Sequence, residues 1–316
     1  MKKFFGILVA GMMMSSCGLI DDLIGDEEEG SSDEPVATDS IAEMPEPGMD
    51  NAYRWIVERI EGGWYSETDN GERREGRAVY EFSYDEYDRV ISMERRMTEG
   101  GDGGEMEEVT LMSFGYGAGG MATVESFWHN GEQEYEMETD YLTNADGYVE
   151  WFSSRRVEDD MEDVTEGRLW YDEEGHVVQM EYPLDYDDDD AEWENGNLIR
   201  VIYKGSENIG QQQAWMQYGN TEWWNNPEVN VDFNWLLASS EWLGCWGFET
   251  MGVKPFDLVG RRSELLMTEE YDEFNEVRSH YMYELDGNGC PVVIQVITEE
   301  DDGSERIQAV YWITYR

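Results

Sequence analysis

The densest run of potential metal ligands in this 316-residue chain is the acidic stretch DYDDDD, which begins at Asp185. Calcium takes about six to eight oxygen ligands from flexible loops, which makes Asp185, Asp187 and Asp189 candidate ligands. The run departs from the EF-hand loop, because Asp190 stands where that loop requires glycine and Gly196 where it requires glutamate. We therefore favour a solvated turn over a calcium site and predict no metal or other cofactor.

Motifs for catalysis are missing from the sequence. The three histidines, His129, His176 and His280, are scattered and lack HExxH spacing, which argues against a zinc centre. There is no GxSxG, Walker or GxGxxG motif, and among 73 Asp and Glu no pair for glycoside hydrolysis stands out. The sequence predicts a non-enzymatic protein, with a hydrolase acting on glycans or peptides as the alternative.

Aromatic side chains between residues 206 and 262 are the strongest candidate for a binding surface. Trp215, Trp223, Trp224 and Trp246 lie in irregular sequence rich in Gly and Asn. Their rings could stack on sugar faces or anchor a protein partner, so the predicted ligand is a glycan or a protein. The alternative, which the usual burial of tryptophan favours, is that they form a small core of this segment.

Two of the three cysteines, Cys245 and Cys290, could form a disulfide in an oxidising compartment. Two separate small buried residues fit the sequence equally well. Neither cysteine lies in a CxxC or Cys–His setting that would indicate a nucleophile.

Cys17 has a different context from the other cysteines. Lys2 and Lys3 precede an apolar run at residues 4–14, and two serines stand directly before Cys17. This pattern resembles a bacterial lipoprotein signal and predicts that residues 1–16 are cleaved and that Cys17 is acylated. The alternative is an ordinary signal peptide that is cut elsewhere.

Charge limits the partners of the chain. Lys and Arg total 21 against 73 Asp and Glu, so the formal net charge is −52 and phosphate contacts with nucleic acid are excluded on any useful scale. The acidity favours cations or basic partners, or it serves only solubility. Residues 17–50, acidic and poor in aromatics, are predicted to be a disordered tether, and residues 51–316 the folded domain.

A recurring hairpin signature organises the folded domain. In VYEFSYDEYDRVISM, residues 79–93, aromatic and polar residues alternate, Asp85 opens a turn and Asp88 closes it. Asp and Asn bond the backbone two residues on, and the closing residue needs positive φ, which glycine supplies without steric cost. The same offsets recur at Asn144 and Gly147, Asp172 and Gly175, and Asp286 and Gly289.

Further turns support the repeat. Phe114 to Gly120 is a looser copy, and the dipeptide Asn195-Gly196 is a strong hairpin signal. The prediction is a mainly β protein, an elongated twisted antiparallel sheet of consecutive hairpins. An irregular or helical insertion is expected at about residues 206–262, where residues 231–242 have helical spacing.

The segments YDEEGHVVQMEY, WENGNLIRVIY and YELDGNGCPVVIQVIT resemble the tyrosine-aspartate hairpin repeats of Rhs-type proteins. More closely, the chain resembles a family of Bacteroidota lipoproteins of unknown function that are built from such hairpins. The resemblance covers roughly residues 55–316. It implies an outer-membrane lipoprotein, with the acidic run after Cys17 favouring the cell exterior and the periplasmic face as the alternative.

Overall fold

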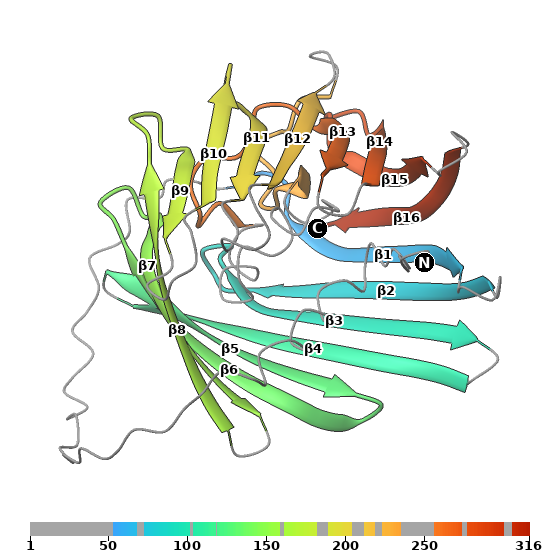
Figure 1. The fold of residues 1–316 in the computed structure, drawn as a ribbon, viewed down its shortest axis with the longest axis horizontal. Helices are drawn as coiled ribbons and strands as arrows, with labels where there is room; N and C mark the ends of the chain where they lie inside the picture. Colours follow the sequence, from blue (N-terminus) through green and yellow to red (C-terminus); the bar gives the residue numbers. More distant parts are fainter. Residues whose placement is uncertain are drawn as a thin grey trace.

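Sixteen antiparallel strands form a closed barrel in the computed structural model (Figure 1). The structure describes residues 53–316 except 68–72, 102–103, 118, 159–160, 182–188, 204–211, 219–222, 235–255, 274–276 and 300–304. The strands are β1 (Val57–Glu67), β2 (Arg73–Tyr84), β3 (Val90–Gly101), β4 (Gly104–Gly117), β5 (Gly120–His129), β6 (Glu132–Thr143), β7 (Val149–Glu158), β8 (Met161–Tyr171), β9 (Val177–Glu181), β10 (Asp189–Glu194), β11 (Asn197–Tyr203), β12 (Gln212–Tyr218), β13 (Met267–Asp272), β14 (Val277–Leu285), β15 (Pro291–Glu299) and β16 (Glu305–Tyr315).

Closure of the sheet corrects the prediction of an elongated sheet, which is wrong, while the prediction of a mainly β fold is confirmed. β1 pairs with β16 as well as with β2, from Val57 opposite Tyr315 to Trp64 opposite Ala309. Every other strand pairs with its neighbours in the sequence. Successive strands twist in one direction, so a long run of hairpins curls, and closure pairs the two edges that an open sheet would expose.

Four turns share one geometry. In these turns, which we call Asx turns, the Oδ1 atom of the opening Asp or Asn accepts hydrogen bonds from the backbone N–H groups two and four residues on, at 2.8–3.0 Å. The closing residue has positive φ, 59° for Asp88 and between 81° and 88° for the glycines. These turns are Asp85 to Asp88, Asn144 to Gly147, Asp172 to Gly175, and Asp286 to Gly289.

Three further turns differ in detail. Asn195 and Gly196, with φ of 50° and 71°, connect β10 and β11. The dipeptide Asn130-Gly131 connects β5 and β6 with φ of 51° and 84°, a hairpin that the sequence signals in the same way but that was not predicted. In the looser copy the positive φ belongs to Gly119, not Gly120.

An aromatic belt joins the strand ends on the side of the barrel where the four Asx turns and both ends of the described chain lie. A ring hydroxyl or indole N–H at the end of an even-numbered strand donates to a carbonyl at the start of the preceding strand, at 2.5–2.8 Å. Each bond holds the open end of one hairpin together. The pairs are Tyr84 with Val57, Tyr116 with Val90, Tyr171 with Val149, Trp193 with Val177, Tyr218 with Leu198, Tyr283 with Met267, and Tyr315 with Pro291.

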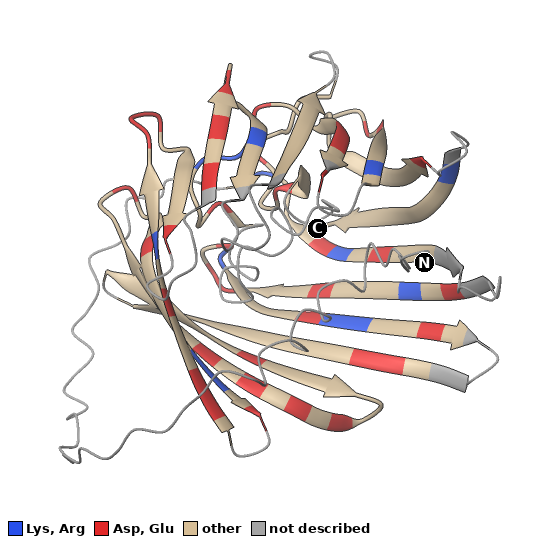
Figure 2. Cartoon of the chain, viewed as in Figure 1, with Lys and Arg blue, Asp and Glu red and all other residues tan. Residues whose placement is uncertain are grey.

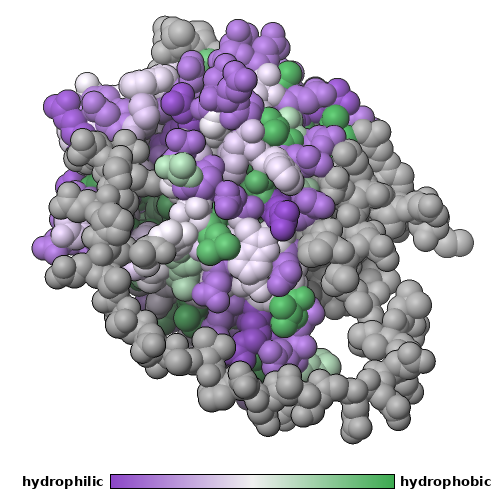
Figure 3. All heavy atoms as spheres, turned by 90° about the vertical axis from the view of Figure 1, so that its left-hand side faces the viewer, coloured by the Kyte–Doolittle hydropathy of each residue, from purple (hydrophilic) through white to green (hydrophobic). Residues whose placement is uncertain are grey.

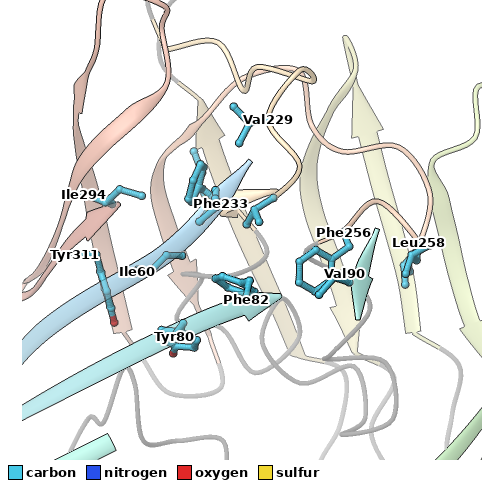
Figure 4. Packing of buried hydrophobic residues seen from close by; sticks show 14 of the residues in the cluster. Ile60, Tyr80, Phe82, Val90, Val229, Phe233, Phe256, Leu258, Ile294 and Tyr311 are labelled. Atoms are coloured by element: carbon cyan, nitrogen blue, oxygen red, sulfur yellow. The ribbon is translucent and has the colours of Figure 1, made fainter. Parts of the chain in front are cut away.

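The barrel lumen at this turn end is filled with packed side chains (Figure 4). Residues 223–234 and 256–266, which we call the plug, extend from between β12 and β13 and pack against inward-facing strand residues. The ring of Phe256 contacts Phe82 and Phe114 edge to face, with centroids 5.9 and 5.8 Å apart. Val229, Phe233 and Leu258 join the same core.

The predicted insertion at residues 206–262 is only partly correct. β12 lies inside that range and is a barrel strand, with Ala214 and Met216 buried and Trp215 and Gln217 facing out. Among the described residues no helical insertion is seen, and most of the predicted helix, residues 235–242, lies outside the described part. No helix in the described part of the chain is long and apolar enough to cross a membrane.

Inward-facing glycines accommodate rings from neighbouring strands. Gly62 lies opposite Tyr311, and Gly76 opposite Trp64. A Cβ atom added at Gly62 would lie 2.4 Å from the Tyr311 ring, and one added at Gly76 would lie 2.1 Å from the Trp64 ring. The absence of a side chain therefore lets each aromatic ring lie against the neighbouring backbone.

The Asp286 turn allows a direct test of the φ requirement. We expect Gly289→Ala to lower the free energy of unfolding by about 1–2 kcal/mol, because φ is 81° and an L-residue is strained there. Nothing lies within 4 Å of the added Cβ, so no steric contact contributes. Urea unfolding followed by tryptophan fluorescence measures the change.

The matched control is Gly287→Ala in the same turn. Its added Cβ also meets open space and its φ is not left-handed, so we expect almost no change. Equal destabilisation by both substitutions would contradict the assignment of the cost to backbone conformation.

Candidate functional site

Asparagine side chains attach the plug to the barrel. Asn230 accepts a hydrogen bond from the backbone N–H of Val57 at 2.8 Å and donates to the Tyr84 hydroxyl at 2.9 Å. Asn234 accepts from the backbone N–H of Met267 at 2.9 Å. An amide side chain offers both donors and an acceptor, so it can satisfy strand ends that lack a ladder partner. The Asn-rich sequence NNPEVNVDFN is the signal that could have predicted this role.

A buried arginine holds the two parts of the plug together. Arg262 forms a two-pronged ion pair with Asp257, with its Nε donating to Oδ1 at 2.8 Å. Its Nη1 donates to the Val231 carbonyl at 3.1 Å. The hydroxyl of Tyr53 donates to the other Asp257 oxygen at 3.3 Å, which ties in the first described residues of the chain.

Asp232 is a fully buried carboxyl group beside this ion pair. Its Oδ1 accepts from the Asn225 side chain and the Asn234 backbone, both at 3.0 Å, while Oδ2 has no hydrogen-bond partner among the described residues. Burial raises the pKa of Asp232 to about 6, although the positive charge of Arg262 opposes the shift. The group is sealed inside the plug, so its chemistry bears on plug stability and not on a solvent-borne substrate.

The predicted aromatic residues lie on two different elements. Trp215 faces outward on β12, is 36% exposed, and lies nearly parallel to Tyr271 with ring centroids 5.8 Å apart. Trp223 is part-buried in the plug against Tyr283, and its neighbour Trp224 is exposed. Trp246 lies outside the described residues. The structure therefore separates Trp215 on the barrel wall from the two plug tryptophans.

The other predicted residues are placed only in part. Asp185, Asp187 and Cys245 lie outside the described residues. The backbone of Asp189 begins β10 and pairs with Met180 of β9. Cys290 is buried directly before β15, and burial raises the pKa of its thiol to about 11, which keeps it protonated.

One group with metal-ligand spacing was not predicted. Single ligand atoms of Asp172, Glu174 and His176 lie within 4.8 Å of one another. However, Oδ1 of Asp172 accepts two backbone N–H groups of its own turn, and Oδ2 lies 3.1 Å from Nδ1 of His176. The same Asx bonding occurs at Asp85 and Asp286 without a histidine, so turn formation accounts for the aspartate.

Charged residues, most of them acidic, are spread along the strands of the barrel (Figure 2). Ion pairs join outward-facing residues of adjacent strands, such as Arg59 with Glu81 at 2.5 Å and Arg96 with Glu107 at 2.6 Å. A shallow groove on the outer wall across β1 to β3 is lined mainly by such charges. On the side where β7, β8 and β9 lie, hydrophilic residues cover most of the described surface (Figure 3).

The fold and its polarity define a class: a closed 16-stranded antiparallel barrel that is apolar and filled at its turn end and charged outside. The chain is similar to a porin-like protein from Bacteroides uniformis, with 14% identity, a TM-score of 0.60, and coverage of 82% of this chain and 96% of that one. A porin-like protein from Bacteroides vulgatus matches at 9% identity and a TM-score of 0.29, over 83% and 99% of the two chains.

At this identity the Bacteroides uniformis likeness shows the barrel fold alone. That structure comes from a Bacteroides species, which fits the Bacteroidota part of the resemblance, while the hairpin-repeat family and the lipid anchor stay predictions. Neither protein-family models nor curated proteins gave a match.

The buried carboxyl group predicts a pH-dependent stability. Asp232 has a higher pKa in the folded state than its ordinary value of 3.8, so the fold favours its neutral form. This stability is present below about pH 4 and is lost as the pH rises through about 6. We expect Asp232→Asn to be more stable than the wild type at pH 8, by an amount on the order of 3 kcal/mol or less, and the gain to vanish near pH 4. Thermal melting across this pH range measures it.

Asp257→Asn serves as the control for that substitution. It leaves the buried Arg262 without its ion-pair partner and should lower the melting temperature at both pH values. A gain for Asp232→Asn that does not depend on pH would contradict the raised pKa.

Proposed function

We propose that the protein is a lipid-anchored barrel of the outer membrane whose wall faces water, and that it has a non-enzymatic binding role. The anchor in this proposal is the acylated Cys17, followed by the acidic tether, and the folded barrel lies at the cell exterior. The tyrosine-aspartate repeat resemblance supports the same assignment.

The observation that carries the proposal is the polarity of the wall. In membrane-spanning barrels, apolar residues face the lipid and polar residues line the lumen. Here Arg77 and Arg155 face out in cross-strand ion pairs, at 3.2 Å to Glu61 and 2.7 Å to Glu138, while Phe82 packs inside. An arginine facing the middle of a bilayer costs about 2–4 kcal/mol, so many outward charges oppose insertion.

A wall that faces water needs another means of attachment to a membrane. The signal-like sequence that ends in Cys17 offers one, because a lipid on that residue requires nothing of the barrel surface. The filled lumen at the turn end also argues for a binding protein over a conduit, since Phe256 packs between Phe82 and Phe114 there.

The lumen carboxylates lend no support to the hydrolase alternative. Glu125 and Glu270 are buried, and each accepts a hydrogen bond from a tyrosine hydroxyl, Tyr135 at 2.6 Å and Tyr281 at 2.8 Å. Burial raises the pKa of Glu125. An acid that is enclosed and already bonded is poorly placed to reach a glycosidic or peptide bond.

Two versions of the chain expressed in a Bacteroides host test the proposal. One is the full-length protein, and the other carries an ordinary cleavable signal peptide joined to Gly18, so that Cys17 is absent. We expect radioactive palmitate to label only the first, and the second to be recovered in the soluble fraction without detergent, with the same melting temperature. Protease treatment of intact cells then reports whether the anchored form faces outward.

The opposite result is equally clear. If the chain without Cys17 stays with membranes after a carbonate wash and needs detergent for solubility, the wall itself lies in lipid. Palmitate labelling of that second version would rule out Cys17 as the acylated residue.

A further inference from the structure

Six side chains form a regular array on the outer wall where β12, β13 and β14 lie side by side (Figure 1). In the first row Trp215 lies opposite Tyr271, and Tyr271 opposite Arg278. In the second row Gln217 lies opposite Glu269, and Glu269 opposite His280. We call these six residues the β12–β14 face. They face outward because the residues between them in each strand, Ala214, Met216, Glu270 and Ser279, are buried in the lumen.

The first row presents aromatic rings to solvent. The rings of Trp215 and Tyr271 are inclined by only 21°, with centroids 5.8 Å apart, and Trp215 is exposed. The guanidinium of Arg278 lies 5.6 Å from the Tyr271 ring centroid and restricts that ring from the other side. Two nearly parallel rings held on adjacent strands make a rigid apolar strip with little side-chain entropy left to lose on binding.

The second row supplies planar polar groups next to that strip. Glu269 lies 3.5 Å from Arg278 and 3.8 Å from His280, so its carboxylate is held between them. Gln217 is exposed on the neighbouring strand. Amide, carboxylate, imidazole and guanidinium groups together offer both donors and acceptors in fixed directions, which suits hydroxyl groups of a ligand.

We propose that the β12–β14 face binds a neutral polysaccharide. This inference rests on the proposed binding function and names its ligand class. A pyranose ring has an apolar face of C–H groups and an equatorial rim of hydroxyls. The C–H face stacks on Trp215 and Tyr271, and the hydroxyls meet the polar row. No other protein surface is needed, since the array is complete on three adjacent strands.

Charge selects a neutral ligand over an anionic one. Two arginines flank the aromatic pair, since Arg200 of β11 lies opposite Trp215 and Arg278 lies opposite Tyr271. Both already have ion-pair partners: Arg200 lies 3.3 Å from Glu192, and Arg278 lies close to Glu269 and, at 3.8 Å, to Glu299. The whole chain has a formal charge of −52, so its field repels polyanions. An uncharged polysaccharide needs no free arginine and is not repelled by the negative field.

Two other tryptophans on the outer wall are exposed but lack the aromatic neighbour that Trp215 has. Trp170 of β8 is 47% exposed and lies opposite Gln179. Trp312 of β16 is 51% exposed and lies opposite Glu61 and Val293. Neither has an aromatic partner across the ladder. Trp215 is less exposed than both but is the one paired with a second ring, which makes Trp170 a matched control.

Affinity electrophoresis tests the proposal with the full-length protein in mild detergent. The gels contain galactomannan, arabinoxylan, xyloglucan or yeast mannan as neutral probes, and polygalacturonate as the anionic probe. We expect at least one neutral polysaccharide to retard the wild type and polygalacturonate not to. Trp215→Ala and Tyr271→Ala should each weaken the retardation by about tenfold or more, as expected for buried aromatic anchors of an interface.

The control variants keep the test decisive. Trp215→Phe retains a ring and should keep most of the binding, and Trp170→Ala should bind like the wild type, with melting temperatures confirming that each variant is folded. The proposal is overturned if none of the neutral probes retards the wild type, if polygalacturonate binds better than all of them, or if Trp170→Ala loses as much as Trp215→Ala. Such a result, with the fractionation of the Cys17 test unchanged, removes the glycan ligand and leaves the anchored barrel in place.

Discussion

The hydrogen-bonded ladder between the first and last strands is the constraint on which the rest of the structure depends. Once Val57 lies opposite Tyr315, every backbone in the sheet has two partners and each strand has one face toward a common lumen. The period-two alternation then assigns every side chain to the lumen or to solvent. Most of the large core residues lie in the lumen, while many charged residues face outward, together with exposed apolar residues such as Trp170 and Trp312. The closed barrel thus carries charged side chains on an outer wall that a lipid-facing barrel would keep apolar.

The plug fills the turn end of the barrel lumen that closure of the ladder creates. Phe233, Phe256 and Leu258 of the plug pack with the strand side chains in one close-packed core. Their loop backbone brings polar groups into the core, and the asparagines and Arg262 satisfy them. The Oδ2 atom of Asp232 has no hydrogen-bond partner among the described residues, and the raised pKa of this group makes the stability of the plug depend on pH.

The sequence predicted features that depend on residues close together in the chain and missed features that depend on residues far apart. Asp85 and Asp88, or Asn195 and Gly196, specify a turn through their own short-range chemistry, so the hairpins could be predicted. Closure depends on contacts between the two ends of the domain, which no local pattern encodes. β12 was not predicted because QQAWMQY alternates only weakly in polarity, with the outward-facing Trp215 between two buried residues. The pairing of Trp215 with Tyr271 depends on a register set across the long plug segment, so the predicted tryptophans could not be sorted into wall and plug.

The glycines that face aromatic rings carry an evolutionary consequence. Gly62 and Tyr311, like Gly76 and Trp64, share one volume, so neither member of a pair can vary alone. A methyl group at the glycine would displace the ring, and a smaller residue at the aromatic position would leave a void in the core. The two positions are far apart in the sequence in the first pair and close together in the second. In both pairs we expect the glycine and the aromatic residue to change together during evolution. The sequence of the barrel wall should therefore tolerate fewer substitutions than its exposed, charged surface would imply.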